Sequence, residues 1–492
     1  MTTPPRLRSD SISELGLSPS DCPSGSGAPV TPEGDSCGVE TLLGDPRAAI
    51  VRLSIPLIIA MSFQTAYNLV DAIWVAGLGS DALAAVGFSF PLFFALTGLA
   101  NGIGIGGSAA IARYIGRRDR ERAERSAEHA LLFGLLTALL ISIPLYIFAL
   151  PIFEAMGAGD VAPLAAEYGR VMFGGSVVVF AAAILSFLLR GEGDARRSSR
   201  IMVAGSILNM ILDPIFIYTL GMGISGAALA TIVSFGITSL VMLYWYLVRR
   251  DTWVRLSLRS FRPSREIFGE VFGVGIPASV QMLSMSFMQI GINLIILMVA
   301  STDGVAIYST GWRVISLASI PLQGISSAVI PVTGAAFGAC AYDKLRIAHG
   351  HSIRFGLRIS VAVGVFIFIF APEVAMLFSW SEDSRHLAEP IALFIRILAF
   401  MVPGISWGML SSSTFQGMGM GVRALIATLF RSLLLTLTFT FTFGVILGHG
   451  LTGIWLGILL ANVIGSVTVF FWTRWSISRL IASSEKPQPV DD

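Results

Sequence analysis

The chain has 492 residues, of which 54% are hydrophobic and only 13% are charged, and its formal net charge at pH 7 is +2. A soluble protein of this length carries roughly a quarter charged residues, and repeated apolar runs of about 18 residues or more indicate helices that cross a bilayer. Lysine occurs only at Lys344 and Lys486. The phosphate-binding sequence GxxxxGK[ST] is therefore absent, which excludes an ATP-driven pump of that type.

The N-terminal stretch differs from the rest of the chain. Residues 1–44 are rich in Ser, Pro, Gly and Asp and hold no apolar run, so we expect a disordered tail and not a signal peptide. Twelve hydrophobic segments follow, each long enough for a membrane helix. Their approximate spans are 50–77, 83–110, 128–150, 164–189, 200–220, 225–248, 267–299, 303–331, 352–371, 388–413, 423–447 and 451–474.

The distribution of arginine orients these segments. Arginines cluster after the second, fourth and sixth segments, at Arg113–Arg120, Arg196–Arg197 and Arg249–Arg265. The alternate loops, such as Gly77–Asp81 and Glu154–Glu167, are free of arginine or acidic. Because positive loops stay in the cytoplasm, both termini are predicted to be cytoplasmic.

Two short sequences of the first half return in the second half. Leu189-Arg-Gly-Glu-Gly193 matches Phe415-Gln-Gly-Met-Gly419, and Gly223-Ile-Ser-Gly226 matches Gly450-Leu-Thr-Gly453. The repeat predicts an all-α polytopic membrane protein with twelve transmembrane helices in two parallel-repeat six-helix lobes, an architecture that transporters use. The predicted divisions are a disordered cytoplasmic tail at 1–44, an N-terminal lobe at 45–248, a basic cytoplasmic linker at 249–266, a C-terminal lobe at 267–475 and a cytoplasmic tail at 476–492.

Two acidic residues lie deep inside apolar segments. Asp213 is in the fifth segment, one helical turn after Asn209, and Asp71 is in the first. An acidic residue in the middle of a membrane helix costs about 2.5–3.5 kcal/mol on insertion scales, so it is normally turned inward and given partners. Each lies eight residues before a glycine of an outer loop, and thus roughly 12 Å inside the outer boundary. Thr231 of the sixth segment reaches a similar depth.

The chemistry of such a pair depends on whether the two carboxylates meet. Two adjacent buried carboxylates do not both remain ionised without a large cost, so the pair can take up and release a proton. The same oxygens, with those of Asn209 and Thr231, can instead hold a sodium ion, which prefers hard oxygen ligands. The residues alone leave both alternatives open.

A polar stripe precedes Asp71 on the first helix. Gln64, Tyr67 and Asn68 stand at helical spacing from it. Polar residues of this kind also serve as hydrogen-bonding contacts between helices, and for Gln64 or Asn68 alone we favour that interpretation. Because Asp71 continues the stripe, we predict a functional face.

The seventh segment carries a second polar and methionine stripe, at Gln281, Met282, Met285 and Gln289. Methionine fills cores and also suits adaptable binding surfaces, and the two interpretations balance here. The glycine-rich run 102–107 imitates a dinucleotide-binding fingerprint. No strand precedes it, and inside a membrane segment glycines permit close helix packing, so we reject a nucleotide site.

These motifs together resemble those of a known family. The run Gln64-Thr-Ala-Tyr-Asn-Leu-Val-Asp71, followed by Ala82-Leu-Ala-Ala-Val-Gly87, is similar to the first two helices of multidrug and toxin extrusion (MATE) transporters. Asn209-Met-Ile-Leu-Asp213-Pro214, followed by Gly223 to Thr231, resembles their fifth and sixth helices. The resemblance covers residues 45–475 and, with the acidic residues in the first half, is strongest to the DinF-like branch.

That resemblance implies a V-shaped molecule of two six-helix lobes, with a central cavity open alternately to each side. It implies cation coupling at Asp71, Asn209, Asp213 and Thr231. It also implies that Gln64 and Tyr67 line a substrate cavity in the N-terminal lobe. In the second lobe, Ile292 and Asn293 stand where the repeat places the counterpart of Asp71, so a sodium site built on carboxylates is not expected there.

We therefore expect a secondary active antiporter that exchanges amphipathic or cationic organic compounds for protons or sodium ions. The alternative is a flippase for a lipid-linked precursor, which would have more cationic residues in its cavity and often extra helices. We expect no enzyme activity, no cofactor besides the coupling ion, no nucleic-acid partner and a monomer in the cell membrane. The predicted cation-coupling residues, which would also ligate sodium, are Asp71, Asn209, Asp213 and Thr231. The predicted substrate-cavity residues are Gln64, Tyr67, Asn68, Met282, Met285 and Gln289.

Overall fold

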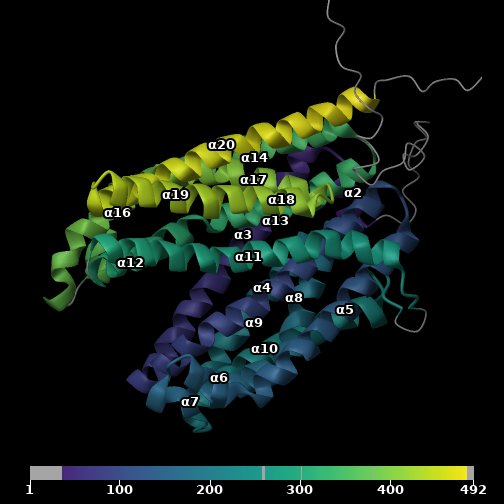
Figure 1. Ribbon diagram of the computed structural model, residues 1–492. Coiled ribbons are helices and arrows are strands. Elements are labelled where there is room, and N and C mark those ends of the chain that lie inside the picture. Colours follow the sequence, from purple (N-terminus) through teal and green to yellow (C-terminus); the bar gives the residue numbers. More distant parts are fainter. Residues whose placement is uncertain (1–35, 258–260, 301, 380–381, 485–492) are drawn as a thin grey trace, which may run out of the picture.

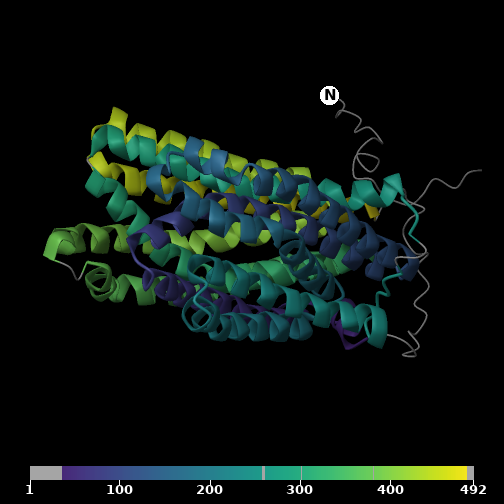
Figure 2. The ribbon, with the colours of Figure 1, turned by 90° about the horizontal axis from the view of Figure 1, so that it is seen from below.

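The computed structural model describes residues 36–257, 261–300, 302–379 and 382–484, and the regular elements in these ranges are helices. The helices form two bundles. Figure 1 shows the bundles together at the end that carries α2 (Cys37–Leu43) and apart at the end that carries α7 (Ala162–Gly174) and α16 (Ala388–Ala399). Seen from below in Figure 2, the long helices of both bundles run in the same general direction.

The first bundle, called the N-lobe, holds the helices up to residue 249. It consists of α3 (Pro46–Ala76), α4 (Ser80–Gly116), α5 (Arg120–Ile147), α6 (Ala149–Ala155), α7, α8 (Ser176–Gly191), α9 (Ala195–Pro214), the π-helix η3 (Ile215–Thr219), α10 (Gly223–Tyr244) and the π-helix η4 (Trp245–Arg249). Proline cannot donate a backbone hydrogen bond, and the α-helical ladder of α9 gives way to the wider π-helix directly after Pro214.

The second bundle, called the C-lobe, begins at residue 265. It consists of α11 (Arg265–Val299), α12 (Thr302–Ala318), α13 (Ile320–Gly338), α14 (Tyr342–Ile369), α15 (Ala371–Phe378), α16, α17 (Met401–Gly417), α18 (Gly421–Thr428), η7 (Leu429–Leu435), α19 (Thr436–Phe441), η8 (Thr442–Ile446) and α20 (Gly450–Ser484).

The number of membrane spans agrees with the sequence. In the described ranges, ten helices are long and apolar enough to cross a membrane. Two further pairs, Gly159–Gly174 with Ser176–Gly191 and Arg385–Ala399 with Met401–Gly417, each bend by 48° at a short break. Counted as one span each, these pairs bring the number to twelve, and the predicted fold class is confirmed. The two bent spans are the fourth and the tenth, which are equivalent in the repeat.

The two lobes meet along the glycine-rich part of α4. A Cβ atom added at Gly106 would overlap the carbonyl oxygen of Val271 on α11, and one added at Gly102 would overlap the Ser279 hydroxyl. The backbones of α4 and α11 therefore approach as closely as glycine allows. The glycine run serves helix packing, as predicted, and not nucleotide binding.

An ion pair closes the same contact at the end of α4 that carries the arginine-rich loop. Arg113 of α4 donates from Nη2 to Oε2 of Glu270 on α11 at 3.1 Å, and Arg117 lies 3.8 Å from the other carboxylate oxygen. Arg113 is 4% exposed and Glu270 is 24% exposed. Partly buried pairs of this kind are screened less than surface pairs, so this one helps to hold the lobes together.

The linker between the lobes is bound to the N-lobe by four side chains. Glu192, directly after α8, accepts hydrogen bonds from the Tyr246 hydroxyl and from the backbone N–H of Trp253, both at 2.8 Å. Burial, opposed in part by these bonds, raises the pKa of Glu192 to about 8. The three other side chains each accept a backbone N–H of the linker at 2.9–3.2 Å; they are Glu124, Glu128 and His129, with Arg255, Ser257 and Ser264 as donors.

Two predicted boundaries are wrong. The tail was expected to be disordered through residue 44, but Cys37–Leu43 forms helix α2, capped by Ser36, and buries Val39 and Leu42 against the lobes. The C-terminal tail was expected from 476, but α20 continues to Ser484. In both cases a few buried apolar side chains stabilise a helix in a segment whose overall composition is polar. Residues 1–35 of the predicted tail lie outside the described residues, as do residues 258–260 of the predicted linker 249–266, which stays a prediction.

Candidate functional site

The deep acidic residues of the two predicted helices face each other in the N-lobe. Helices α3 and α9 pack against each other, and the carboxyl groups of Asp71 and Asp213 come within hydrogen-bonding range. Asp213 is fully buried and Asp71 is partly buried. The similar depths of Asp71 and Asp213 in their helices do not show whether the helices touch, and the structure shows that they do.

Asn209 and Thr231 complete the environment of Asp213. Asn209 is 3% exposed and Thr231 is 8% exposed. With the amide oriented so that both its ends are satisfied, the nitrogen donates to Oδ2 of Asp213 at 3.2 Å and the oxygen accepts from the Thr231 hydroxyl at 3.3 Å. The amide thus links α9 to α10. The four predicted cation-coupling residues therefore form one cluster.

One oxygen of this cluster has no protein partner. Oδ1 of Asp71 is buried and accepts no hydrogen bond from any residue that the structure describes. Burying a carboxylate oxygen without a partner costs free energy, and a bound proton or cation would offset that cost. The donor set around it consists of carboxylate, amide and hydroxyl oxygens, which are hard ligands. This chemistry fits a proton or a sodium ion.

Two tyrosines border the acid pair, and only one of them was predicted. Tyr67 of α3 lies within electrostatic range of both Asp71 and Asp213, as the stripe on the first helix indicated. Tyr168 of α7 also lies close to Asp71, Tyr67 and Asp213, and its side chain is 9% exposed. Nothing in the sequence around Tyr168 marks it, because its role depends on the packing of α7 against α4 and α10.

The other residues of the first-helix stripe lie beside the cluster and not in it. Gln64 is seven residues before Asp71, or roughly 10 Å along the helix axis. Its side chain is partly buried, whereas that of Asn68 is exposed. A lining role for Gln64, Tyr67 and Asn68 in a substrate cavity stays a prediction.

The predicted cavity residues of α11 lie in the other lobe. Met282 packs against α4, where its Cβ would be 3.3 Å from a Cβ placed on Gly98. The side chains of Met285 and Gln289 are exposed. Gln281 is turned into the C-lobe, where its Oε1 accepts from Nε2 of Gln416 at 2.8 Å. A single cavity lined by residues of both stripes also stays a prediction.

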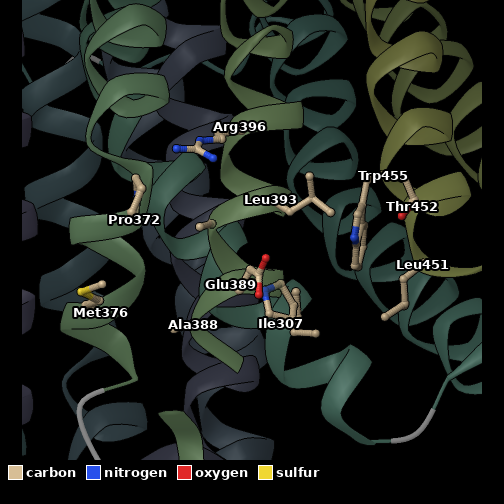
Figure 3. A pocket seen from close by; sticks show the side chains of 12 residues that line it. Ile307, Pro372, Met376, Ala388, Glu389, Leu393, Arg396, Leu451, Thr452 and Trp455 are labelled. Atoms are coloured by element: carbon tan, nitrogen blue, oxygen red, sulfur yellow. The ribbon is translucent and has the colours of Figure 1, made fainter. Parts of the chain in front are cut away.

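A cavity of about 580 Å³ lies in the C-lobe at the end where the two bundles are apart, and neither residue of the acid pair lines it. It is bounded by α12, α15, α16 and α20, and Figure 3 shows Arg396 and Glu389 of α16 with Trp455 of α20 around it. None of the predicted site residues is among those that line it.

Comparisons with known proteins agree on one family. The family model described as MatE matches residues 56–215 and 277–442. The chain is 26% identical over 453 residues to the probable multidrug resistance protein YoeA of Bacillus subtilis, covering 87% of this chain and 94% of that protein. It is 26% identical over 426 residues to the multidrug export protein MepA of Staphylococcus saprophyticus, covering 84% and 90%.

Solved structures extend the likeness to three dimensions. A MOP superfamily transporter from Pyrococcus furiosus is 43% identical with a TM-score of 0.89, over 91% of this chain and 100% of that one. An outward-facing multidrug resistance MATE family transporter is 42% identical with a TM-score of 0.88, over 92% and 100%. Placement in the DinF-like branch stays a prediction. The match to both halves of the sequence and to the complete fold shows that the chain belongs to the MatE family of multidrug and toxin extrusion transporters.

Proposed function

We propose that the chain is a secondary active antiporter that expels small amphipathic, often cationic, organic compounds in exchange for protons or sodium ions. Its named relatives are multidrug resistance and export proteins. The observation that carries the coupling mechanism is the contact of Asp71 with Asp213 inside the N-lobe, with one carboxylate oxygen left unpaired.

The acid pair supplies the chemistry of coupling. Two carboxyl groups in contact share one proton more readily than they bear two charges. The arrival of a proton or a sodium ion therefore changes the balance of charge between α3 and α9. A ligand shifts a conformational equilibrium only by its difference in affinity for the two states, and helices that come together on binding provide that difference. Asn209 fixes Asp213 to Thr231, so the shift also reaches α10.

The arrangement of the lobes corresponds to an outward-facing state. The lobes meet at the Arg113–Glu270 ion pair and the glycine contact, and diverge at the opposite end (Figure 1). The likeness to an outward-facing relative supports this assignment. We place both termini and the arginine-rich loops in the cytoplasm and the protein, as a monomer, in the cell membrane.

A drug-efflux assay in proteoliposomes tests the proposal. Asp71→Asn and Asp213→Asn should each abolish substrate movement driven by a proton or sodium gradient, because each removes a charge on which coupling depends. Each gradient applied alone distinguishes the two ions. If both variants transport at the wild-type rate under every gradient, the acid pair is not the coupling site.

The flippase alternative is not favoured. The curated relatives are drug exporters, and the twelve spans leave no extra helices in the described ranges. We propose that Gln64, Tyr67 and Asn68 contact the substrate from the N-lobe, and that Met282, Met285 and Gln289 do so from the C-lobe.

A further inference from the structure

A small pocket of about 180 Å³ lies where the two lobes meet, on the other side of the molecule from the predicted substrate stripe of α11. Its walls come from the first turn of α3, in the N-lobe, and the middle of α14, in the C-lobe, and these two helices contact each other. Each residue that lines it is basic; they are Arg47, His351, Arg354 and Arg358.

The positive charge of this pocket is not neutralised within the described protein. None of the three arginines forms an ion pair in the described ranges, although Arg346 on the same helix pairs with Asp343 at 3.0 Å. Asp45 faces the pocket, but its side chain caps α3 by accepting from the backbone N–H of Arg47 at 3.1 Å. With Asp45 counted and His351 neutral, an excess of two positive charges remains.

The pocket also contains a polar atom without a partner. Nε2 of His351 is buried and has no hydrogen bond to any described residue. The Arg354 side chain is oriented by its own helix, since Nε donates to the carbonyl oxygen of Gly350 at 3.0 Å. The Nη groups of the pocket's arginines provide hydrogen-bond donors for an anion, as does Nε2 of His351 in the tautomer that carries its proton there, and guanidinium groups match the geometry of phosphate oxygens.

Two contacts place the pocket near the cytoplasmic surface. Lys344, at the start of α14, donates to the carbonyl oxygen of Leu43 at 2.7 Å, so α14 and α3 begin at the same level. His351 follows the start of α14 by nine residues, and in the N-lobe His129 follows the start of α5 by nine. His129 contacts the linker at Ser264, which identifies this level as the cytoplasmic edge of the bundle.

The same face of α14 becomes apolar toward the outside. Arg354 and Arg358 are followed at helical spacing by Val361 and Val365, whose side chains are 44% and 53% exposed. A ligand that fits this face carries an anionic group at the cytoplasmic end and apolar chains above it. A phospholipid of the inner leaflet has this form, whereas a free phosphate ion would leave the apolar part of the face uncovered.

We propose that this pocket binds the phosphate group of an anionic phospholipid from the cytoplasmic leaflet. Basic pockets between membrane helices on that side are suited to such headgroups. One wall belongs to each lobe, so a bound lipid contacts both and favours the arrangement in which α3 and α14 are close. The inference rests on the orientation given under Proposed function, but not on antiport.

Native mass spectrometry of the purified full chain tests the proposal without substrate or gradient, so a failure of antiport does not affect it. Phosphatidylglycerol should bind more tightly than phosphatidylcholine. Because each arginine contributes roughly fivefold to the binding of an anionic lipid, the Arg354→Gln/Arg358→Gln variant should lose on the order of twentyfold in phosphatidylglycerol affinity.

Two further variants serve as controls. Arg346→Gln removes one positive charge from the same helix, outside the pocket, and should leave the affinity unchanged. Arg354→Lys/Arg358→Lys should retain most of it, because the charge stays. The substituted side chains are exposed, and an unchanged melting temperature in phosphatidylcholine verifies that the variant folds. Wild-type affinity for phosphatidylglycerol in the glutamine variant overturns the proposal. So does inorganic phosphate binding as tightly as the lipid, since the site then takes a free anion.

Discussion

The two lobes share one helical plan and fill its equivalent positions with opposite chemistry. Aligning the repeats at Gly223 and Gly450 pairs three of the N-lobe site residues with neutral residues in the C-lobe. Asn209, Asp213 and Thr231 correspond to Thr436, Thr440 and Ile458, which are 3%, 0% and 2% exposed. At these three positions the N-lobe has an acidic residue with an amide and a hydroxyl partner, and the C-lobe has two threonines and an isoleucine.

The side chains at these positions differ in whether their own helix supplies their hydrogen-bond partners. The Thr440 hydroxyl donates to the carbonyl oxygen of Thr436 at 2.7 Å, and the Thr436 hydroxyl donates to that of Arg431 at 3.1 Å. The hydroxyl of a threonine in a helix can thus donate its hydrogen bond to a backbone carbonyl oxygen of the preceding turn and needs no other partner. Asp213 has no donor in its own helix except Asn209, and the unpaired oxygen of Asp71 has none in the described structure. The comparison teaches that equivalent positions of a repeated scaffold can hold an acidic cluster in one copy and threonines bonded within their own helix in the other, although Oδ1 of Asn293 in the C-lobe is also buried without a partner among the described residues.

The largest effect that this comparison predicts is at the acid pair. Asp213→Asn should lower gradient-driven efflux by about a hundredfold or more. Without the coupling ion at this carboxylate, the shift between the outward-open and inward-open states that efflux requires is lost. Thr440→Val, at the equivalent C-lobe position, should leave the rate within a factor of about two, because only a bond within the helix is lost. Initial rates in proteoliposomes measure both. Equal losses in the two variants would contradict the division of roles between the lobes.

The contact between the lobes provides the second prediction. Gly106→Ala places a methyl group against the carbonyl oxygen of Val271, and such overpacking costs about 1–3 kcal/mol. The closed cytoplasmic side should become less populated, and efflux should fall about tenfold. Gly273→Ala is the control, since nothing lies within 4 Å of a Cβ at that glycine. Labelling of a single cysteine introduced on the cytoplasmic side should rise in the first variant only.

Glu192 provides the third prediction, and its C-lobe equivalent is the neutral Met418. The pKa of Glu192 is raised from 4.5 to about 8, so the folded state holds a proton that the unfolded state releases. Stability therefore falls as the pH rises from 4.5 to 8, by up to about 1.4 kcal/mol per pH unit from this group. Glu192→Gln should flatten the dependence of melting temperature on pH in this window. Glu121→Gln, whose side chain is 74% exposed, should not change it.

Tyr168 provides the smallest prediction. Tyr168→Phe removes the hydroxyl near the acid pair and keeps the packing of the ring, so efflux should fall by about two- to fivefold, as expected for one hydrogen-bonding group. Phe173→Leu on the same helix changes a side chain that stacks on Phe153 and has no hydroxyl, so it should leave the pH at half-maximal efflux unchanged. A shift of that pH in Tyr168→Phe, measured in the same vesicles, separates a role at the site from a role in packing. No shift would remove Tyr168 from the site.

Much of the fold could be predicted because a membrane span has a strong signal in composition and length. The residues Asp71 and Asp213 could be found for the same reason, since a charge in hydrocarbon is costly and therefore rare. Their contact could not, because the packing of α3 against α9 is not encoded in the depth of a residue. Tyr168 and Glu192 were missed because neither residue type is unusual at its place in the sequence. Only the tertiary structure brings Tyr168 close to the carboxylates and Glu192 close to the linker.

The way in which the linker is held has a mechanical consequence. Its backbone hydrogen bonds from Trp253, Arg255, Ser257 and Ser264 go to side chains of the N-lobe. The described parts of the linker are therefore held by the N-lobe as far as Ser264, directly before α11 begins at Arg265. Ser264 therefore joins the two bodies directly, since its backbone N–H donates to His129 of the N-lobe while its side chain accepts from the backbone N–H of Ile267 in the first turn of α11.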